Sequence, residues 1–392
     1  MKKKVTMIVN PDLFPISAGH HKAIYEICRY LHGKQGLMLK LIVLSRADLR
    51  DVEAYKKICD EVVHVRIPRS WGFWDVLNKV VIRLGRTVNC ELGWSLGMRK
   101  LVRKECADAD VVLMNYVLWH ALLDNATLRD RTIVITLDIM FYRRQSFGRM
   151  RSLFERLMVS WDRWAELRML KRFWRVCVLA EYEEALLKGG GIPEKQILRI
   201  GLPILMEGEI SKKEKVEFDF ITIGSNIYQN EEGVRCFFER VVPLLNGRVV
   251  TFAVAGSLSQ NSMFNSGLVP NNVKVCKLGH VDDFSAVCSR ALIGIGTVPY
   301  GSGIKVKIVE MIMNGLPVVV TNSGQEGIPV MEEGCINIDT ASPDEASHKL
   351  KQWLDAPQMV IESGRRQGKL LRNLFSPSTC MIPLLKAIES KV

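Results

Sequence analysis

The sequence predicts an α/β protein built from two doubly wound, parallel-sheet domains that face one another across a cleft. Short runs rich in Val, Ile and Leu alternate with amphipathic stretches along all 392 residues, which is typical of a parallel sheet covered on both faces. The alternation stops once, near residues 189–216, and then begins again. Two successive domains of similar size follow, and a chain of this length can bury two cores.

The first domain is predicted to span residues 1–200. Residues 5–10 form a short strand, and a loop with Gly19 leads to an amphipathic helix over residues 22–31, which is how a doubly wound domain begins. The further apolar runs predict strands at residues 39–45, 62–67, 110–116, 132–137 and 176–180.

The second domain is predicted to span residues 201–375. Its start, residues 201–216, holds Pro203 and a mixed charge run and is interpreted as a linker. Strands are predicted at residues 218–224, 249–256, 273–278, 292–298, 317–321 and 336–339. A last helix is expected at 381–389, and residues 376–392 are free to pack back on the first domain. Since ligands of open α/β sheets bind beyond the carboxyl ends of the strands, we expect the site in the cleft.

The net charge of +12 is uneven, because residues 1–200 hold 35 Lys and Arg against 22 Asp and Glu, a net +13. This half is therefore expected to meet an acidic partner. The ten cysteines are dispersed without a C-x-x-C pair, which predicts reduced, mostly buried thiols and no metal site. No apolar run reaches the roughly 18 residues of a membrane span, and the basic N-terminus has too short an apolar stretch for a signal peptide. A cytoplasmic protein is expected.

Residues 301–327, GSGIKVKIVEMIMNGLPVVVTNSGQEG, carry the clearest chemical signal. Gly301 and Gly303 let backbone N–H groups approach an anion at the start of a helix, and Lys305 adds a full positive charge. Glu310 follows at a distance where its carboxylate can accept two hydrogen bonds from a diol such as ribose. This order predicts a nucleotide or nucleotide-sugar site. The alternative is an ordinary loop, helix and strand with a surface lysine.

The second half also resembles a known family. Residues 218–245, 249–257 and 273–328 match, in order, the pattern of the group 1 glycosyltransferases, family 4 in the usual classification of sugar transferases, which have the two-domain, Rossmann-like GT-B fold. Residues 131–144 and 173–204 resemble the N-terminal domain of the same family.

The resemblance implies transfer of a sugar from a nucleotide-sugar co-substrate to a hydroxyl acceptor with retention at the anomeric carbon, with no cofactor and no obligatory metal. The donor would lie against the second domain and the acceptor against the first. Glu310 falls on the second glutamate of the family's E-x7-E motif, which usually binds ribose. Ser302 replaces the first glutamate, which usually touches the sugar, so backbone groups of Gly303 and Ile304 would serve the donor there.

A second departure lies at Gly224 and Ser225, where many members carry an Arg and a nearby Lys that clamp the diphosphate. Because both are missing here, Lys305 is the candidate for stabilising the leaving diphosphate, a role that needs a positive charge where negative charge develops. Val281 resembles the residue against which the nucleotide base rests.

Three residues of the first domain are candidates on the acceptor side. Gly19 resembles part of a glycine pair in the family's first loop, and His120 resembles a histidine that faces the transferred sugar. Asp138, at the end of a predicted strand, is a further catalytic candidate. The alternatives are a histidine satisfied within a helix interface and an aspartate that caps a strand end or helix.

Residues 149–175 hold eight Arg or Lys and three Trp, and one helical face gathers apolar side chains, among them Leu157, Trp161 and Trp164. A basic helix with Trp on its apolar side suits an anionic membrane surface. Residues 71–103 are a second candidate of this kind. The alternative is a core helix whose Trp face packs under the first sheet.

The resulting hypothesis is a retaining, hexosyltransferase-like enzyme of cell-surface polysaccharide or glycolipid synthesis, peripheral on the cytoplasmic face of the membrane. Its acceptor would be a saccharide or lipid-linked saccharide. The alternatives are a catalytically silent partner subunit that binds nucleotide-sugars, and a nucleotide-sugar epimerase with this fold. Nucleic acid is not an expected partner, since the sequence contains no recognisable binding module.

Overall fold

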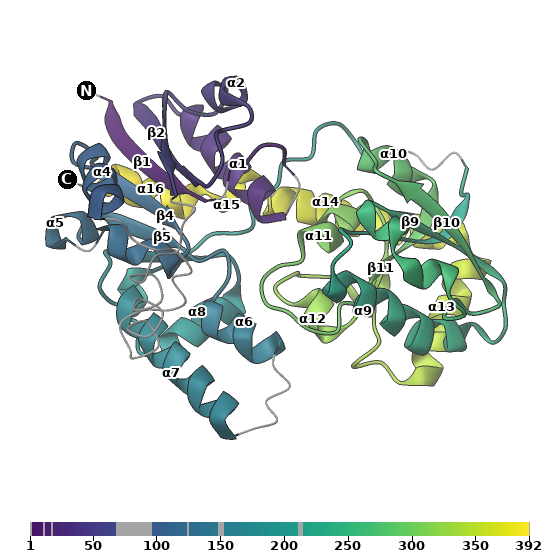
Figure 1. Ribbon diagram of the computed structural model, residues 1–392. Helices are drawn as coiled ribbons and strands as arrows, with labels where there is room; N and C mark the ends of the chain where they lie inside the picture. Colours follow the sequence, from purple (N-terminus) through teal and green to yellow (C-terminus); the bar gives the residue numbers. More distant parts are fainter. Residues whose placement is uncertain are drawn as a thin grey trace. The chain divides into compact units, whose positions relative to one another are not determined.

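A computed structural model describes residues 2–10, 12–16, 19–67, 96–123, 125–147, 153–210 and 215–391. The chain divides into two compact units (Figure 1). The first unit comprises Met1–Leu205 together with Phe375–Val392, and the second comprises Met206–Leu374. Each unit is built around a parallel sheet, which confirms the predicted α/β fold class.

The described part of the first unit contains a seven-stranded parallel sheet in the order β3-β2-β1-β4-β5-β6-β7. The chain starts in the middle, winds outward, and then returns past β1 to wind the other way, so helices cover both faces. The strands are β1 Lys3–Val9, β2 Leu37–Ser45, β3 Glu61–Arg66, β4 Val111–Asn115, β5 Thr132–Ile135, β6 Arg175–Val178 and β7 Ile197–Arg199. The α-helices are α1 Gly19–His32, α2 Val52–Lys56, α4 Leu96–Glu105, α5 Ala126–Arg129, α6 Met140–Phe147, α7 Leu153–Leu170, α8 Glu181–Gly189, α15 Pro377–Cys380 and α16 Ile382–Ser390, with the 3-10 helices η2 Val117–Leu123 and η3 Glu194–Gln196.

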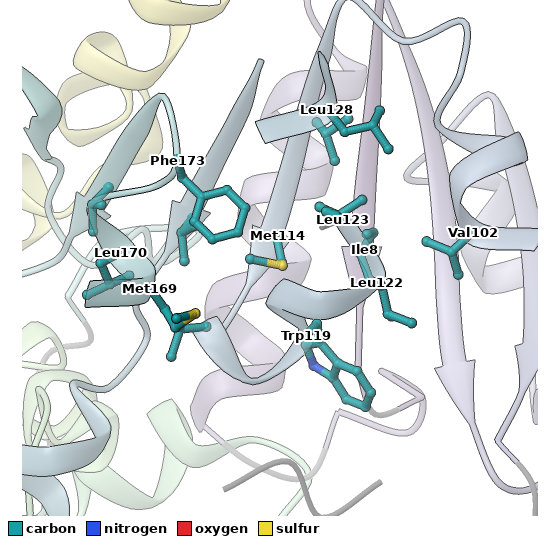
Figure 2. Close-up of a cluster of buried hydrophobic side chains, with 14 of the residues drawn as sticks. Ile8, Val102, Met114, Trp119, Leu122, Leu123, Leu128, Met169, Leu170 and Phe173 are labelled. Carbon is teal, nitrogen blue, oxygen red and sulfur yellow. The ribbon is translucent and has the colours of Figure 1, made fainter. Parts of the chain in front are cut away.

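The core of the first unit forms because its central strands are apolar on both faces. All five residues of β4 are buried, and the register Met7↔Leu113 aligns it with the equally apolar β1. On one face of the sheet, Met114 packs with Trp119 of η2, with Leu170 at the end of α7 and with Phe173 in the turn that follows α7 (Figure 2). The core thus fixes the segments that directly follow β4.

The second unit repeats this winding over six described parallel strands, in the order β10-β9-β8-β11-β12-β13. Its core includes Phe237, whose ring centroid lies 5.3 Å from that of Phe220 and 4.6 Å from that of Phe252. The strands are β8 Phe218–Ile223, β9 Val250–Ala255, β10 Val273–Gly279, β11 Ala291–Gly296, β12 Val318–Val320 and β13 Cys335–Asn337. The helices are α9 Tyr228–Cys236, the π-helix η4 Phe237–Val241, η5 Val242–Leu245, η6 Ser257–Gln260, η7 Ser262–Asn265, α10 Phe284–Ser289, α11 Val306–Met313, α12 Asn322–Gln325, η8 Glu332–Gly334, α13 Pro343–Asp355 and α14 Pro357–Leu374.

The C-terminal segment packs on the first unit. Helix α15 contacts α1, and α16 contacts β7. Lys391 Nζ donates a 2.6 Å hydrogen bond to the carbonyl oxygen of Asp130 and lies 4.5 Å from the ring centroid of Trp174. The helix predicted at residues 381–389 is present as α16.

Helix α7 corrects one sequence-based alternative. Its buried side is formed by Ala165, Glu166, Met169 and Leu170, whereas Leu157, Trp161 and Trp164 are 62, 41 and 46% exposed. The interpretation that the Trp face packs under the sheet is therefore wrong. The buried residues all lie in the last part of the helix, residues 165–170, and the exposed Leu157, Trp161 and Trp164 precede them.

Two further features bear on the membrane hypothesis. In the second candidate segment, residues 71–95 lie outside the described residues, while 96–103 belong to α4. Within the described ranges, no helix is both long and apolar enough to cross a membrane. The nine described cysteines are free, and all except Cys276 are buried.

Candidate functional site

The strand order of the second unit locates a ligand site at the carboxyl ends of β8 and β11. These two strands are neighbours, and the chain winds away from them in opposite directions. Loops that follow such strands diverge and leave a crevice, where open α/β sheets bind their ligands. The loop after β8 holds Gly224 and Ser225, and the loop after β11 leads to residues 301–305. The structure therefore brings two predicted donor-binding segments to the same edge of one sheet.

The turn before α11 requires glycine. Gly301 and Gly303 have φ values of 126° and 75°, which L-residues with a Cβ rarely adopt. A Cβ on Gly301 would lie 2.2 Å from Gln229 Nε2 of α9, and this same amide donates a 2.6 Å hydrogen bond to the carbonyl oxygen of Tyr300. The turn is thus tied to the first turn of α9.

Lys305 is the N-cap residue of α11, and its ammonium group turns back over the glycine turn and makes no side-chain cap to the helix. Its Nζ donates to the carbonyl oxygens of Gly303 at 2.7 Å and Ser302 at 3.3 Å, and it lies 3.9 Å from Glu326 Oε2. The predicted cation is therefore at the glycine turn, where it organises the loop backbone. Ser302 and Ile304 are partly buried in the same turn, between Gly301 and the helix.

Glu310 lies in the second turn of α11 and is partly buried. Its backbone carbonyl accepts hydrogen bonds from the backbone N–H and the side-chain amide of Asn314, at 3.0 and 2.9 Å, so the end of the helix is closed. Lys307 and Glu310 are three residues apart and therefore share one side of the helix. Glu310 remains a prediction as a ribose ligand.

The remaining predicted donor residues also lie beyond strand ends. Gly224 donates its N–H to the carbonyl oxygen of Ala255 and accepts at its own carbonyl from the Leu258 N–H, so the loop after β8 is fixed to the loop after β9. Ser225 is exposed. Val281 follows β10, at the outer side of the sheet, between the highly exposed side chains of His280 and Asp282.

Sequence reasoning missed Lys307. This lysine lies in the first turn of α11, and its Nζ donates a 2.7 Å hydrogen bond to Asn230 Oδ1 on α9. Burial first, and then the charge of Lys305, lower its pKa to about 8. The signal that points to it in the sequence is indirect: the loop at Gly224 lacks basic residues, and Lys307 is a second lysine beside Lys305 at the start of α11.

In the first unit, two of the predicted residues lie just beyond β4 and β5. His120 is buried in η2, and its Nδ1 lies 2.9 Å from the carbonyl oxygen of Val117. Because a carbonyl only accepts, Nδ1 carries the proton in the neutral ring. Asp138 Oδ2 accepts a 3.1 Å hydrogen bond from Arg143 Nη1. Both assignments remain predictions.

Two further residues of the first unit, Tyr116 and His20, adjoin these candidates and have an unusual backbone conformation or an unusual pKa. Tyr116, directly after β4, has a φ of 63°, a strained value that is found disproportionately at functional sites. Burial, and then the charge of Asp138, raise its pKa. His20 has its pKa lowered to about 4 by burial, then by His21 and Arg143, so it is neutral at pH 7. It adjoins Gly19, the first residue of α1.

Among the residues that the structure describes, no group of three or more His, Cys, Asp or Glu side chains is placed to hold a metal ion.

Known proteins resemble this chain in two ways. Residues 217–356, a little over a third of the chain, match the family model described as glycosyl transferases group 1. This match covers the sheet edge with Gly224, Lys305 and Glu310, and it confirms the resemblance that the sequence predicted. No curated protein matches the chain by sequence.

Solved structures match over the whole chain at low identity. HepE of Anabaena in complex with UDP has 12% identity and a TM-score of 0.66, with 99% of this chain and 100% of that chain covered. TarM has 10% identity and a TM-score of 0.69, with 100% and 99% covered. Sucrose-phosphate synthase from Thermosynechococcus elongatus has 13% identity and a TM-score of 0.66, with 99% and 98% covered. The fold is therefore the GT-B fold of glycosyltransferases.

Proposed function

We propose that the protein is a retaining glycosyltransferase that moves a sugar from a nucleotide-sugar donor to a saccharide or lipid-linked saccharide acceptor, in the synthesis of cell-surface polysaccharide or glycolipid. One observation carries the proposal: the positive-φ glycine turn, Lys305 and Glu310 lie together at one edge of the second sheet. The family match covers this segment. HepE, which shares the fold, binds UDP, and this supports a nucleotide-sugar donor.

The chemistry follows from the charges at this edge. Cleavage of the bond between sugar and diphosphate leaves negative charge on the diphosphate, which the N-terminus of α11 and the nearby ammonium groups stabilise. The acceptor hydroxyl attacks from the same face as the leaving group departs, and its proton passes to the departing diphosphate oxygen as the new glycosidic bond forms, so the configuration is retained. Neither a side-chain nucleophile nor a metal ion is part of this proposal.

The experiment pairs Glu310→Ala with Glu362→Ala, which removes an exposed carboxylate from the same unit. Titration calorimetry with UDP, GDP and ADP, followed by a transfer assay with the matching nucleotide-sugars, separates binding from catalysis. Glu310→Ala should lose most of the affinity of whichever nucleotide the wild type binds, while Glu362→Ala retains it. Wild-type binding without transfer or donor hydrolysis across the panel would instead identify a silent nucleotide-sugar-binding subunit, the alternative that Ser302 raises.

We also propose that α7 places the enzyme on an anionic membrane surface. Leu157, Trp161 and Trp164 form an exposed stripe in the part of α7 that precedes its buried residues 165–170, and the ring centroids of the two Trp lie 5.3 Å apart. Exposed arginines accompany the stripe, and Arg168 Cζ lies 5.0 Å from the ring centroid of Trp164. Apolar insertion flanked by cations is the arrangement of an interfacial helix, and the net +13 of residues 1–200 adds long-range attraction.

A further inference from the structure

The ammonium group of Lys307 has an unusual partner. It donates a 2.7 Å hydrogen bond to Asn230 Oδ1, a neutral amide oxygen. In the described part of the chain no carboxylate pairs with it, and the only charge that acts on its pKa is the like charge of Lys305. A partly buried ammonium is thus held without a counter-ion.

This arrangement costs free energy in the unliganded protein. Taking an ammonium out of water is unfavourable unless an opposite charge compensates it, and here a second ammonium opposes it. Lys305 has a different environment, since two backbone carbonyls and Glu326 surround it. Lys307 is therefore the less compensated cation of the pair.

Asn230 links Lys307 to the loop after β8. Its Nδ2 donates a 2.8 Å hydrogen bond to the carbonyl oxygen of Ser225, and a Cβ on Gly224 would lie 2.7 Å from the same nitrogen. The Lys307 ammonium thus lies one carboxamide away from the Gly224–Ser225 backbone. This is the loop in which the resemblance leads one to expect an Arg and a Lys and in which this chain has neither.

We propose that Lys307, positioned by Asn230, binds the diphosphate of the donor and so supplies from α11 the charge that the loop after β8 lacks. The inference rests on the proposed function and assigns the phosphate contact to a particular side chain. One of the three ammonium protons serves Asn230, which leaves donors for phosphate oxygens. Asn230 acts as a positioning residue, since it holds the ammonium beside the loop.

The test uses the full chain and UDP, GDP and ADP as probes, with uridine, guanosine and adenosine as controls without phosphate. Lys307→Met keeps the length of the side chain and removes the charge, Lys307→Arg keeps the charge, and N230K/K307M moves the charge to α9, beside the loop after β8. Lys307→Met should lower the affinity of the nucleotide that the wild type binds at least tenfold, and leave the nucleoside affinity unchanged. Lys307→Arg should stay within about threefold of wild type, and the double variant should regain part of the loss.

A second measurement needs no neutral variant and so does not depend on its folding. Only the protonated lysine attracts phosphate, so wild-type affinity should fall about tenfold between pH 7 and pH 9 as Lys307 titrates near pH 8. Lys307→Arg should remove this dependence. Lys305 and Glu326 are present in both proteins and cancel in the comparison.

The outcomes separate the two proposals. Wild type that binds none of the three diphosphates overturns the proposed function, and the inference with it. Wild type that binds a diphosphate, with Lys307→Met folded and equal to it in affinity, overturns the inference alone. If Lys307 were merely structural, Lys307→Met would lower thermal stability, but the affinities of wild type and Lys307→Arg would depend on pH in the same way, and this result would overturn the inference.

Discussion

The side-chain amide of Gln229 donates a 2.6 Å hydrogen bond to the carbonyl oxygen of Tyr300 and so fixes the glycine turn to α9. The same nitrogen occupies the space in which a Cβ on Gly301 would stand. Gly301→Ala should therefore destabilise the protein by about 2 kcal/mol, through the clash and the positive φ together. It should also weaken nucleotide binding at least tenfold. Urea unfolding and calorimetry measure the two effects.

The matched control for Gly301→Ala is Gly267→Ala in the same unit. A Cβ on Gly267 meets nothing within 4 Å, and its φ is not in the left-handed region. Its unfolding free energy should stay within about 0.5 kcal/mol of wild type. Equal stabilities for the two variants would mean that the turn has another conformation in solution.

Glu166 predicts a pH-dependent stability. It is completely buried, and its Oε1 and Oε2 accept hydrogen bonds from the backbone N–H groups of Met140 at 3.0 Å and Phe141 at 2.7 Å, at the start of α6. Burial raises its pKa to about 7, against the lowering effect of these two bonds. Because the folded state binds the proton more tightly, the contribution of the neutral carboxyl to stability is complete below about pH 4.5 and is lost as the pH rises through 7.

The measurement compares the free energy of unfolding of wild type and Glu166→Gln between pH 5 and pH 8. Wild type should lose about 2 kcal/mol more than the variant over this range. Glu155→Gln, an exposed change on the same helix, controls for net charge. Parallel pH profiles for wild type and Glu166→Gln would contradict the assignment.

The strands were predictable because parallel strands buried on both faces are continuous apolar runs. All runs that were predicted as strands form strands, with ends shifted by a few residues. The missed strand, β7 Ile197–Arg199, has only three residues, lies at the sheet edge and is partly exposed, so its sequence carries no apolar run. Pairing with β6 creates it, and such tertiary pairing is not visible in local sequence.

Site residues could be predicted where the backbone conformation requires glycine. They were harder to predict where the role of a long side chain depends on which residue it hydrogen-bonds to in the folded protein. Gly301 and Gly303 have positive φ as a phosphate-binding turn requires. The difference between Lys305 and Lys307 arises from Asn230 on another helix, 77 residues away along the chain. For α7, the apolar periodicity identified an amphipathic face. It did not show whether this face packs against the protein core or is exposed, because Trp is found both in cores and at interfaces.

The exposed stripe on α7 predicts binding to anionic vesicles. Wild type should float with vesicles that contain phosphatidylglycerol at low salt and release at high salt, since screening weakens the attraction of the arginines. W161S/W164S should lose most of this binding by removing the apolar contribution. Met359→Ser, which removes an exposed apolar side chain from the second unit, is the control. Equal flotation of W161S/W164S and Met359→Ser would reject α7 as the contact.

The anchoring of the C-terminal segment predicts a local loss of stability on truncation. Removal of residues 375–392 takes away α15 and α16 and the contact of Lys391 with Trp174. Hydrogen exchange should speed up in β6 and β7 and stay unchanged in β8 and β9. Faster hydrogen exchange in both units alike would contradict the prediction that the segment stabilises only the first unit.

Lys391→Ala, which removes one exposed contact, should lower the free energy of unfolding by at most about 1 kcal/mol.

The return of the chain to its first unit has a consequence for biosynthesis. On the ribosome, residues 206–374 emerge as one continuous piece and can complete their sheet and core, whereas residues 1–205 must wait for 375–392. The half of the protein that is translated first is thus the half that finishes folding last. Until α15 and α16 are made, the surfaces of α1 and β7 that these helices contact stay uncovered, and uncovered surface of this kind favours aggregation.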